Sequence, residues 1–320
     1  MIIGNRKSWI LKSNTMNFGL INKPNTSTDD FFGAISRSDN VIVNESGDWT
    51  AWLPIPENQS GYGFDCYGCV SFSALNCIET LLSRMGIVSN LSDRFLAKMS
   101  GTLQGVGNTV AQVADTIRHK GDVDESVWPY DRKTMNSWDK FYSEIPQEVK
   151  DEALDLLKHY EITYEFVRYA DIKEALKYAP LQVGVYAWLD PVNGVYPCDK
   201  DKPQNHLVML FKYDDEGYPY IFDHYNQSIK KLAKDFRFGS VLRYSVRKTQ
   251  PPMLEIKNNS LIQQIPGSGE FGIYIEGNIF IDDLAKILAT WHMRNGVDKA
   301  IVSKKIWDSV PHMNLKRELI

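Results

Sequence analysis

The feature that most constrains this chain is a run of apolar side chains that recur at three- and four-residue steps after a glycine-rich stretch. Such spacing predicts an amphipathic helix, and Gly86, which follows the run, is a typical C-terminal cap. Cys69 falls in the first turn of this helix. The chain therefore buries one face of a helix that begins with a cysteine. The recurring positions are Phe72, Leu75, Ile78, Leu82 and Met85.

The chemistry of Cys69 has to be separated from that of the three other cysteines, Cys66, Cys77 and Cys198. A closed zinc site needs four ligands, usually as two close pairs, and the pair Cys66 and Cys69 has no second pair to match it. A thioredoxin-like redox pair follows a buried strand, whereas a glycine-rich loop precedes this one. Four cysteines are too few for a disulfide framework in 320 residues. The pattern favours a nucleophilic thiol, because free backbone N–H groups and the helix dipole stabilise a thiolate at a helix N-terminus.

A nucleophilic thiol needs an imidazole partner, and the chain has six histidines. His119 and His159 lie near the C-terminal ends of predicted helices, where an imidazole complements the helix dipole. His206 instead opens an apolar run, so its ring projects from a rigid strand. His206 therefore stands out as a candidate partner of Cys69, and His224 lies close by in the sequence. The remaining two, His292 and His312, fall in the C-terminal tail.

Helical and strand patterns separate along the chain. Further helices are expected at 91–101, 108–121, 148–160 and 171–178, and β-rich runs at 181–188, 206–213, 218–225 and 240–246. After about residue 248 the composition shifts at a proline-containing linker, and the tail predicts a hairpin near residue 277 and a helix over 282–295. The first half is thus mostly helix and the second mostly strand, with a separate C-terminal module.

With these residues in view, the chain resembles the papain-like cysteine peptidases from about Asp48 to about Val246. The segment 48–59, "DWTAWLPIPENQ", is similar to the family's segment that opens with Asp-Trp and ends in Asn-Gln, and "CYGCVSFSALN" is similar to its nucleophile motif. "ADTIRHKGDVDESVWPYD" and "NHLVMLFKY" match later segments in the same order. The start "FGLINKPNTSTDDFFGA" resembles bacterial and bacteriophage members without a propeptide.

The resemblance implies roles for four residues. Cys69 becomes the nucleophile, His206 the general base and acid, and Gln59 the side-chain donor of the oxyanion hole. The third member of the triad falls on Asp223, with Asn226 as its rival, where the family usually has an asparagine. Gln59 stands ten residues before Cys69 rather than the family's six, so the inserted loop "SGYGFD" is expected to reshape the oxyanion hole.

Substrate contacts also follow from the resemblance. Gly107 and Asn108 stand where the family has paired glycines that bond to the substrate backbone. Gly184 and Leu207 would line the S2 pocket, which a glycine at position 184 would enlarge. The arm before Asp48 is too short and irregular for the helical propeptide of secreted members, so activity would be limited by location, by the tail or by a closed cleft.

The implied architecture is an α+β, papain-like two-lobe fold. We expect an N-terminal arm over 1–47 and a peptidase domain over 48–248. Its helical lobe, with the cysteine-bearing helix at its centre, covers about 60–150, and an antiparallel, barrel-like β lobe covers about 160–248. Residues 249–320 form the accessory module.

The implied function is a cysteine endopeptidase that acts on polypeptides without a metal or cofactor. The alternatives are a phage peptidoglycan amidase or endopeptidase, and a non-catalytic virion or scaffold protein docked through the C-terminal module. A net charge of -4 argues against nucleic acid, and no apolar run is long enough to span a membrane or to serve as a signal peptide. We expect the protein in a bacterial host cytoplasm or a phage virion.

Overall fold

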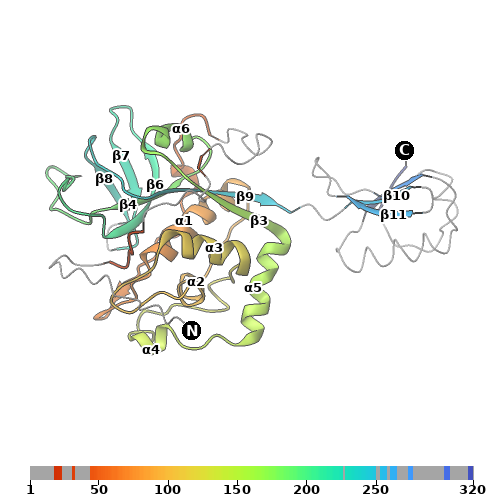
Figure 1. Ribbon diagram of the computed structural model, residues 1–320, viewed down its shortest axis with the longest axis horizontal. Coiled ribbons are helices and arrows are strands. Elements are labelled where there is room, and N and C mark those ends of the chain that lie inside the picture. Colours follow the sequence, from red (N-terminus) through yellow and green to blue (C-terminus); the bar gives the residue numbers. More distant parts are fainter. Residues whose placement is uncertain are drawn as a thin grey trace, which may run out of the picture. The chain divides into compact units, whose positions relative to one another are not determined.

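The computed structural model describes residues 18–23, 31–32, 44–225 and 228–249, and beyond them only the backbone of five short strands between 253 and 319. The chain divides into two compact units, Met1–Arg247 and Lys248–Ile320. Figure 1 shows helices and a large sheet in the first unit. This α+β composition confirms the predicted fold class.

Most helices of the first unit precede its large sheet in the sequence. Ser92 caps one of them by accepting a hydrogen bond from the Phe95 N–H, and Thr109 caps another through the Gln112 N–H. Gly121 ends the latter with φ 69°, where a Cβ would lie 1.9 Å from the Ala153 carbonyl oxygen. The helices are α1 (Cys69–Arg84), α2 (Asp93–Met99), α3 (Val110–Lys120), α4 (Trp138–Phe141), α5 (Gln147–His159) and α6 (Ile172–Ala175), with 3-10 turns η2 (Thr50–Trp52) and η3 (Tyr169–Asp171).

The C-terminal half of the first unit forms a seven-stranded sheet in the order β3-β9-β4-β6-β7-β8-β5. Strand β4 pairs antiparallel with β6 and β9, and β7 pairs antiparallel with β6 and β8, whereas β5 runs parallel to β8. The strands are β3 (Tyr160–Phe166), β4 (Leu181–Val185), β5 (Val195–Tyr196), β6 (His206–Tyr213), β7 (Pro219–Phe222), β8 (Ile229–Leu232) and β9 (Val241–Lys248).

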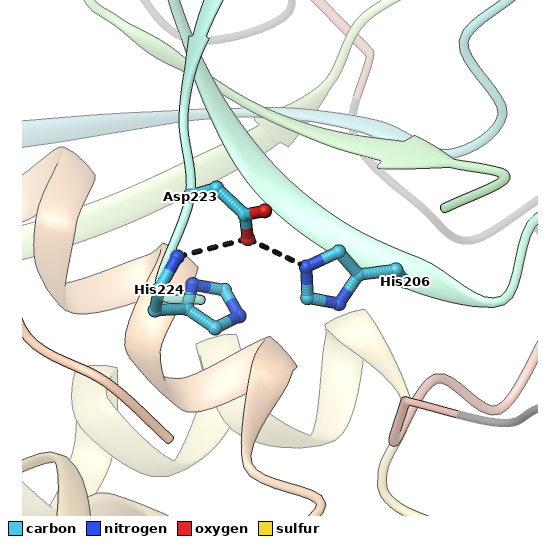
Figure 2. Close-up of side chains that lie close together, drawn as sticks. All are labelled: His206, Asp223 and His224. Atoms are coloured by element: carbon cyan, nitrogen blue, oxygen red, sulfur yellow. Dashed lines mark hydrogen bonds and ion pairs between the residues drawn. The ribbon is translucent and has the colours of Figure 1, made fainter. Parts of the chain in front are cut away.

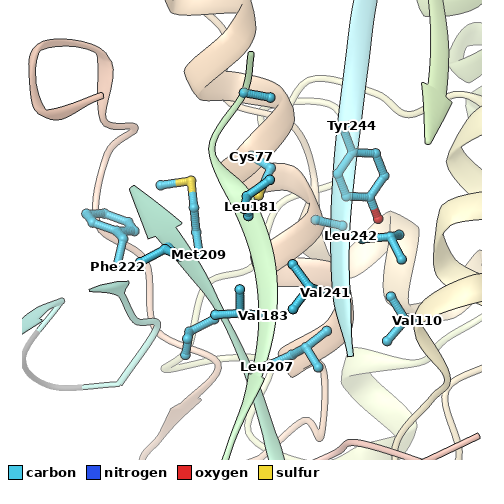
Figure 3. Close-up of a cluster of buried hydrophobic side chains, with 14 of the residues drawn as sticks. Cys77, Val110, Leu181, Val183, Leu207, Met209, Phe222, Val241, Leu242 and Tyr244 are labelled. Atoms are coloured by element: carbon cyan, nitrogen blue, oxygen red, sulfur yellow. The ribbon is translucent and has the colours of Figure 1, made fainter. Parts of the chain in front are cut away.

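Helix α1 is more deeply buried than its sequence pattern predicts. It begins at Cys69 as expected, but every residue from Cys69 to Leu82 is buried, because β4 and β6 contact one side and α2 and α3 another. Figure 3 shows its Cys77 among side chains of the sheet. The sheet supplies partners to polar groups of this helix: the Gln182 amide on β4 donates to the Val70 carbonyl and the Ser73 hydroxyl, both at 2.8 Å. The helix is therefore a central core element and not an amphipathic surface helix.

The second unit is described by its strands alone. Strand β10 (Met253–Lys257) lies between β11 (Ser260–Gln264) and β12 (Ile273–Glu276), antiparallel to the first and parallel to the second. Strand β13 (Lys299–Val302) runs parallel to β14 (Lys316–Leu319). The predicted helix over 282–295 and the turn of the predicted hairpin lie outside the described residues. Among the described helices, none is long and apolar enough to cross a membrane.

Candidate active site

The Cys69 thiol lies at the N-terminus of α1, against β6. It is fully buried, and the backbone of Leu207, the residue after His206, hydrogen-bonds to it. Burial raises the pKa of the Cys69 thiol well above its ordinary value, and the nearby charges of Asp65 and Asp223 raise it further. The structure thus brings Cys69 beside the His206 segment, with the thiol protonated in this state.

His206 and Asp223 form a buried pair. The His206 Nε2 lies 2.8 Å from the Asp223 Oδ1, and both side chains have zero exposure. Figure 2 shows the same carboxylate oxygen accepting the backbone N–H of His224, at 2.8 Å. Burial opposes ionisation, but the adjoining His206, His224 and Lys230 hold the pKa of the Asp223 carboxyl well below its ordinary range. The other candidate, Asn226, lies outside the described residues.

The second oxygen of Asp223 has partners that sequence reasoning missed. The Lys230 ammonium donates to Oδ2 at 2.7 Å, and the Trp188 indole N–H donates to the same atom at 3.1 Å. Lys230 is 5% exposed, so this is a buried ion pair. The sequence signal that could have revealed Lys230 is the alternation of side chains along β8, which places Lys230 on the buried face with Leu232.

The insertion between Gln59 and Cys69 folds out as a small hairpin. Strand β1 (Ser60–Gly61) pairs with β2 (Phe64–Asp65), and the turn uses positive φ at Tyr62 and Gly63. The Cys66 N–H donates to the Gln59 carbonyl at 3.3 Å across the base of this hairpin. The extra residues are therefore looped out, and Gln59 lies beside the start of the segment that leads to Cys69.

The Gln59 amide is held by neighbouring acceptors. Its Nε2 donates to the Asp65 Oδ1 at 2.8 Å, to the Phe18 carbonyl at 3.1 Å and to the Tyr225 hydroxyl. An amide nitrogen has two hydrogens, so these three acceptors share two donors. Asp65 therefore fixes the orientation of the predicted oxyanion donor, a role that the sequence did not reveal.

Residues 18–22, the N-terminal segment, lie between the two lobes at this site. The Phe18 ring packs on the rings of His206 and Tyr225, each with a centroid separation of 5.4 Å. The segment is hydrogen-bonded on both sides, and Leu20 is 5% exposed. Its bonds are Phe18 N–H to Asn205 O at 3.2 Å, Asn108 N–H to Gly19 O at 2.9 Å, Ile21 N–H to Asn108 O at 2.7 Å and Asn22 Nδ2 to Gln204 O at 2.7 Å.

The N-terminal segment fits closely because two glycines face each other. A Cβ on Gly107 would lie 1.8 Å from the Gly19 carbonyl oxygen, and a Cβ on Gly19 would lie 2.2 Å from the Tyr67 carbonyl oxygen. Both glycines also have positive φ, 94° and 112°. Backbone therefore approaches backbone on both sides of the segment, and the cleft is closed.

The predicted substrate-binding residues fall into two groups. Gly107 and Asn108 contact the N-terminal segment, as described above. Leu207 has zero exposure and belongs to the main core cluster, so its side chain lines no open pocket here. A Cβ on Gly184 would lie 1.6 Å from the Gln204 Oε1, so the space that this glycine was expected to add to the pocket is filled by Gln204.

The cluster of His206, Asp223 and His224 has the side chains that a metal site would use. One potential ligand atom from each lies within 4.8 Å of the others. Burial lowers the pKa of His224 well below its ordinary value, which keeps it neutral, and neither ring nitrogen has a partner among the described residues. A divalent cation would, however, bind the same carboxylate as the Lys230 ammonium, at 2.7 Å. Charge repulsion makes the cluster a poor metal site.

Comparisons with known proteins find similarity in structure. Xylellain, a cysteine protease from Xylella fastidiosa, superposes with a TM-score of 0.51 at 15% identity, over 73% of this chain and 97% of that one. The proCathepsin B S9 from Trypanosoma congolense gives 0.51 at 13% identity, over 73% and 86%. No family model and no curated protein matches the sequence.

Proposed function

Because the chain has a papain-like α+β fold, we propose that it is a cysteine-type endopeptidase with Cys69 as the nucleophile. The sulfur attacks a peptide carbonyl carbon while His206 accepts the thiol proton. His206 then gives that proton to the leaving amine as the C–N bond breaks, which leaves a thioester. Water, deprotonated by His206, hydrolyses the thioester and regenerates the thiol. Asp223 orients the imidazole throughout through its 2.8 Å hydrogen bond.

The observation that carries this proposal is that a peptide already lies at the site. Residues 18–22 are bound through backbone groups of Asn108 and Asn205 and through the Gln59 amide. Backbone hydrogen bonds recognise a polypeptide whatever its side chains. A groove of this kind therefore supports a polypeptide substrate over a glycan strand.

Gln59 is the proposed oxyanion donor because it already binds a carbonyl oxygen. Its Nε2 donates to the Phe18 carbonyl at 3.1 Å. A substrate carbonyl oxygen in the same place would accept a hydrogen bond from the Gln59 amide and a second one from the backbone N–H of Cys69. Such donors act most strongly when they are preorganised in a site that excludes water, and Gln59 is fully buried.

A substrate reaches this site only after the N-terminal segment leaves. In the closed state the segment occupies the backbone partners that we assign to the substrate, and burial keeps the Cys69 thiol protonated. Departure of the segment would hydrate the cleft and remove part of that burial, which lowers the pKa of the thiol. The sequence suggested three ways to limit activity: location, the C-terminal tail and a closed cleft. Of these we favour the closed cleft.

An epoxide probe that reacts only with an activated thiol tests the proposal. We expect slow labelling of Cys69 in the folded protein, located by mass spectrometry, with Cys69→Ala as the unlabelled control. Digestion of an unfolded protein should depend on the same residue. A peptidoglycan hydrolase would instead clear purified cell walls without digesting unfolded protein. If the probe never labels Cys69 but iodoacetamide labels it after unfolding, a non-catalytic role replaces this proposal.

A further inference from the structure

We propose that Lys230 is a positioning residue for the reaction: its ammonium neutralises Asp223, so that the carboxylate orients His206 without holding it as a permanent imidazolium. This inference rests on the proposed function of Cys69 and His206. The described contacts of the Lys230 ammonium include the Asp223 carboxylate and the rings of Trp188 and Tyr196. Its effect passes through the carboxylate.

The geometry divides the two oxygens of Asp223 between two tasks. Oδ1 accepts from His206 and from the backbone N–H of His224, both at 2.8 Å. Oδ2 accepts from the Lys230 ammonium at 2.7 Å and from the Trp188 indole at 3.1 Å. The Lys230 nitrogen also lies 5.5 Å from the centre of the Trp188 ring. The ammonium is therefore fixed by the carboxylate on one side and an aromatic face on the other.

The charges explain why an ammonium is needed here. A buried carboxylate without a permanent partner would be stable only beside a protonated imidazole, because an uncompensated buried charge is strongly unfavourable. His206 would then give up its proton reluctantly, although the reaction needs it to lose and regain one. With Lys230 present, the carboxylate is compensated in both protonation states of His206. The Asp223–Lys230 pair is formally neutral, as an asparagine would be.

Other titratable groups face the same pair but do not supply this positive charge. Cys69 lies on α1, Asp65 on β2, and His224 and Tyr225 follow Asp223 in the chain. Burial keeps His224 neutral by lowering its pKa, and raises the pKa of Tyr225 and of the Cys69 thiol, so those two stay protonated and uncharged. Asp65 accepts from Gln59 and Tyr225, and a carboxyl group cannot supply a positive charge. Among the described residues, Lys230 is the group that offsets Asp223 in both protonation states of His206, whereas the charge of His206 offsets it only while the imidazole is protonated.

The test is a double-mutant cycle of Lys230→Met and Asp223→Asn. For each variant, two rates are measured as a function of pH: the inactivation of Cys69 by an epoxide and the hydrolysis of a peptide. The alkaline limb is the fall of these rates at high pH. Lys230→Met should move the alkaline limb up by about one pH unit, because the bare carboxylate retains the imidazolium. Asp223→Asn should move it down, because the ammonium is then unpaired. Each single variant should lose about 10- to 100-fold in rate, and the double variant should recover most of the loss.

Two controls separate positioning from a merely structural role. Lys230→Arg keeps the charge and should keep the wild-type alkaline limb. Lys231→Met removes the neighbouring lysine, which pairs with the partly exposed Asp214 at 2.9 Å, and should leave the limb unchanged. Should Lys230→Met fail to fold, the Asp223→Asn single variant and the double variant still provide the comparison. The inference would be overturned if the rate losses of the two single variants multiplied in the double variant. It would also be overturned if the alkaline limb of the pH profile moved in the same direction in both single variants.

Failure of the proposed function is distinguishable from failure of this inference. The His206 imidazole is titrated directly by NMR in the wild type and in the three variants of the cycle, which requires no turnover. If the titration moves in opposite directions in the two single variants while no peptide is hydrolysed, the positioning role stands and the peptidase proposal falls. If peptides are hydrolysed and the titration does not move, the positioning role falls.

Discussion

Displacing the N-terminal segment should activate the protein, and Gly19→Ala is the sharpest way to do it. A Cβ at this position would lie 2.2 Å from the Tyr67 carbonyl oxygen, which belongs to rigid backbone, and φ is 112°. Neither strain can be relieved by rotating a side chain. The substitution should therefore expel residues 18–22 from the cleft while leaving Cys69, His206 and Gln59 intact.

The size of the effect follows from what holds the segment in place. Five hydrogen bonds, each worth about 1 kcal/mol net, join residues 18–22 to Asn205, Asn108, Gln204 and Gln59. Burial of the Leu20 side chain adds about 2 kcal/mol. Ordering five residues of backbone costs about 5 kcal/mol, at roughly 1 kcal/mol each. The closed state is thus favoured by about 2 kcal/mol, which corresponds to about 30-fold in population.

The assay is the second-order rate of Cys69 labelling by the epoxide, followed by mass spectrometry. We expect Gly19→Ala to label about 30-fold faster than the wild type. Gly217→Ala is the matched control, because its φ is 87° but a Cβ would meet nothing within 4 Å. It carries the same kind of backbone strain without displacing the segment. Equal labelling rates in the wild type and Gly19→Ala, with both folded, would refute the closed-cleft reasoning.

Three further predictions concern the site and its supporting structure. Gln59→Ala should lower kcat about 100- to 1000-fold, because it removes one oxyanion donor, and should also lower the melting temperature, because the buried amide loses its hydrogen bonds to Asp65 and to the Phe18 carbonyl; an unchanged kcat would assign the oxyanion role elsewhere. Burial raises the pKa of Glu125 to about 7, above its unfolded value of 4.5, so its contribution to stability is present below pH 4.5 and is lost as the pH rises towards 7. Urea unfolding should give a higher free energy of unfolding at pH 5 than at pH 8 from this cause. The gap between the two values should shrink in Glu125→Gln and stay the same in the exposed control Glu152→Gln. Arg243→Met should cost about 3–5 kcal/mol, because it leaves the buried Glu165 without the 2.7 Å ion pair, and adding Glu165→Leu should restore most of the loss in chemical denaturation.

Local sequence patterns were sufficient to place the main elements that carry the site. The three- and four-residue spacing predicted a helix that begins at Cys69, and α1 does begin there. The apolar run that follows the turn-like segment ending at Asn205 predicted a strand that opens with His206, and β6 begins at that residue. These features are readable because helix and strand periods are properties of neighbouring residues. The roles assigned to Cys69, His206, Asp223 and Gln59 came from the family resemblance and remain predictions.

Only the tertiary structure decided how those elements are completed. The insertion before Cys69 folds out as a hairpin and supplies Asp65 to the Gln59 amide, and residues 18–22 close the cleft from the other end of the chain. Lys230 on β8 pairs with Asp223, which follows β7. Helix α1 is covered by β4, β6, α2 and α3, and its own apolar spacing does not say which elements will pack on it. The contacts of residues 18–22 and of α1 join segments distant in sequence, whereas Gln59 and Asp65, and Asp223 and Lys230, lie six and seven residues apart and are brought together by the pairing of adjacent strands. Their formation depends on how closely whole elements pack, which a periodic pattern within one element does not encode.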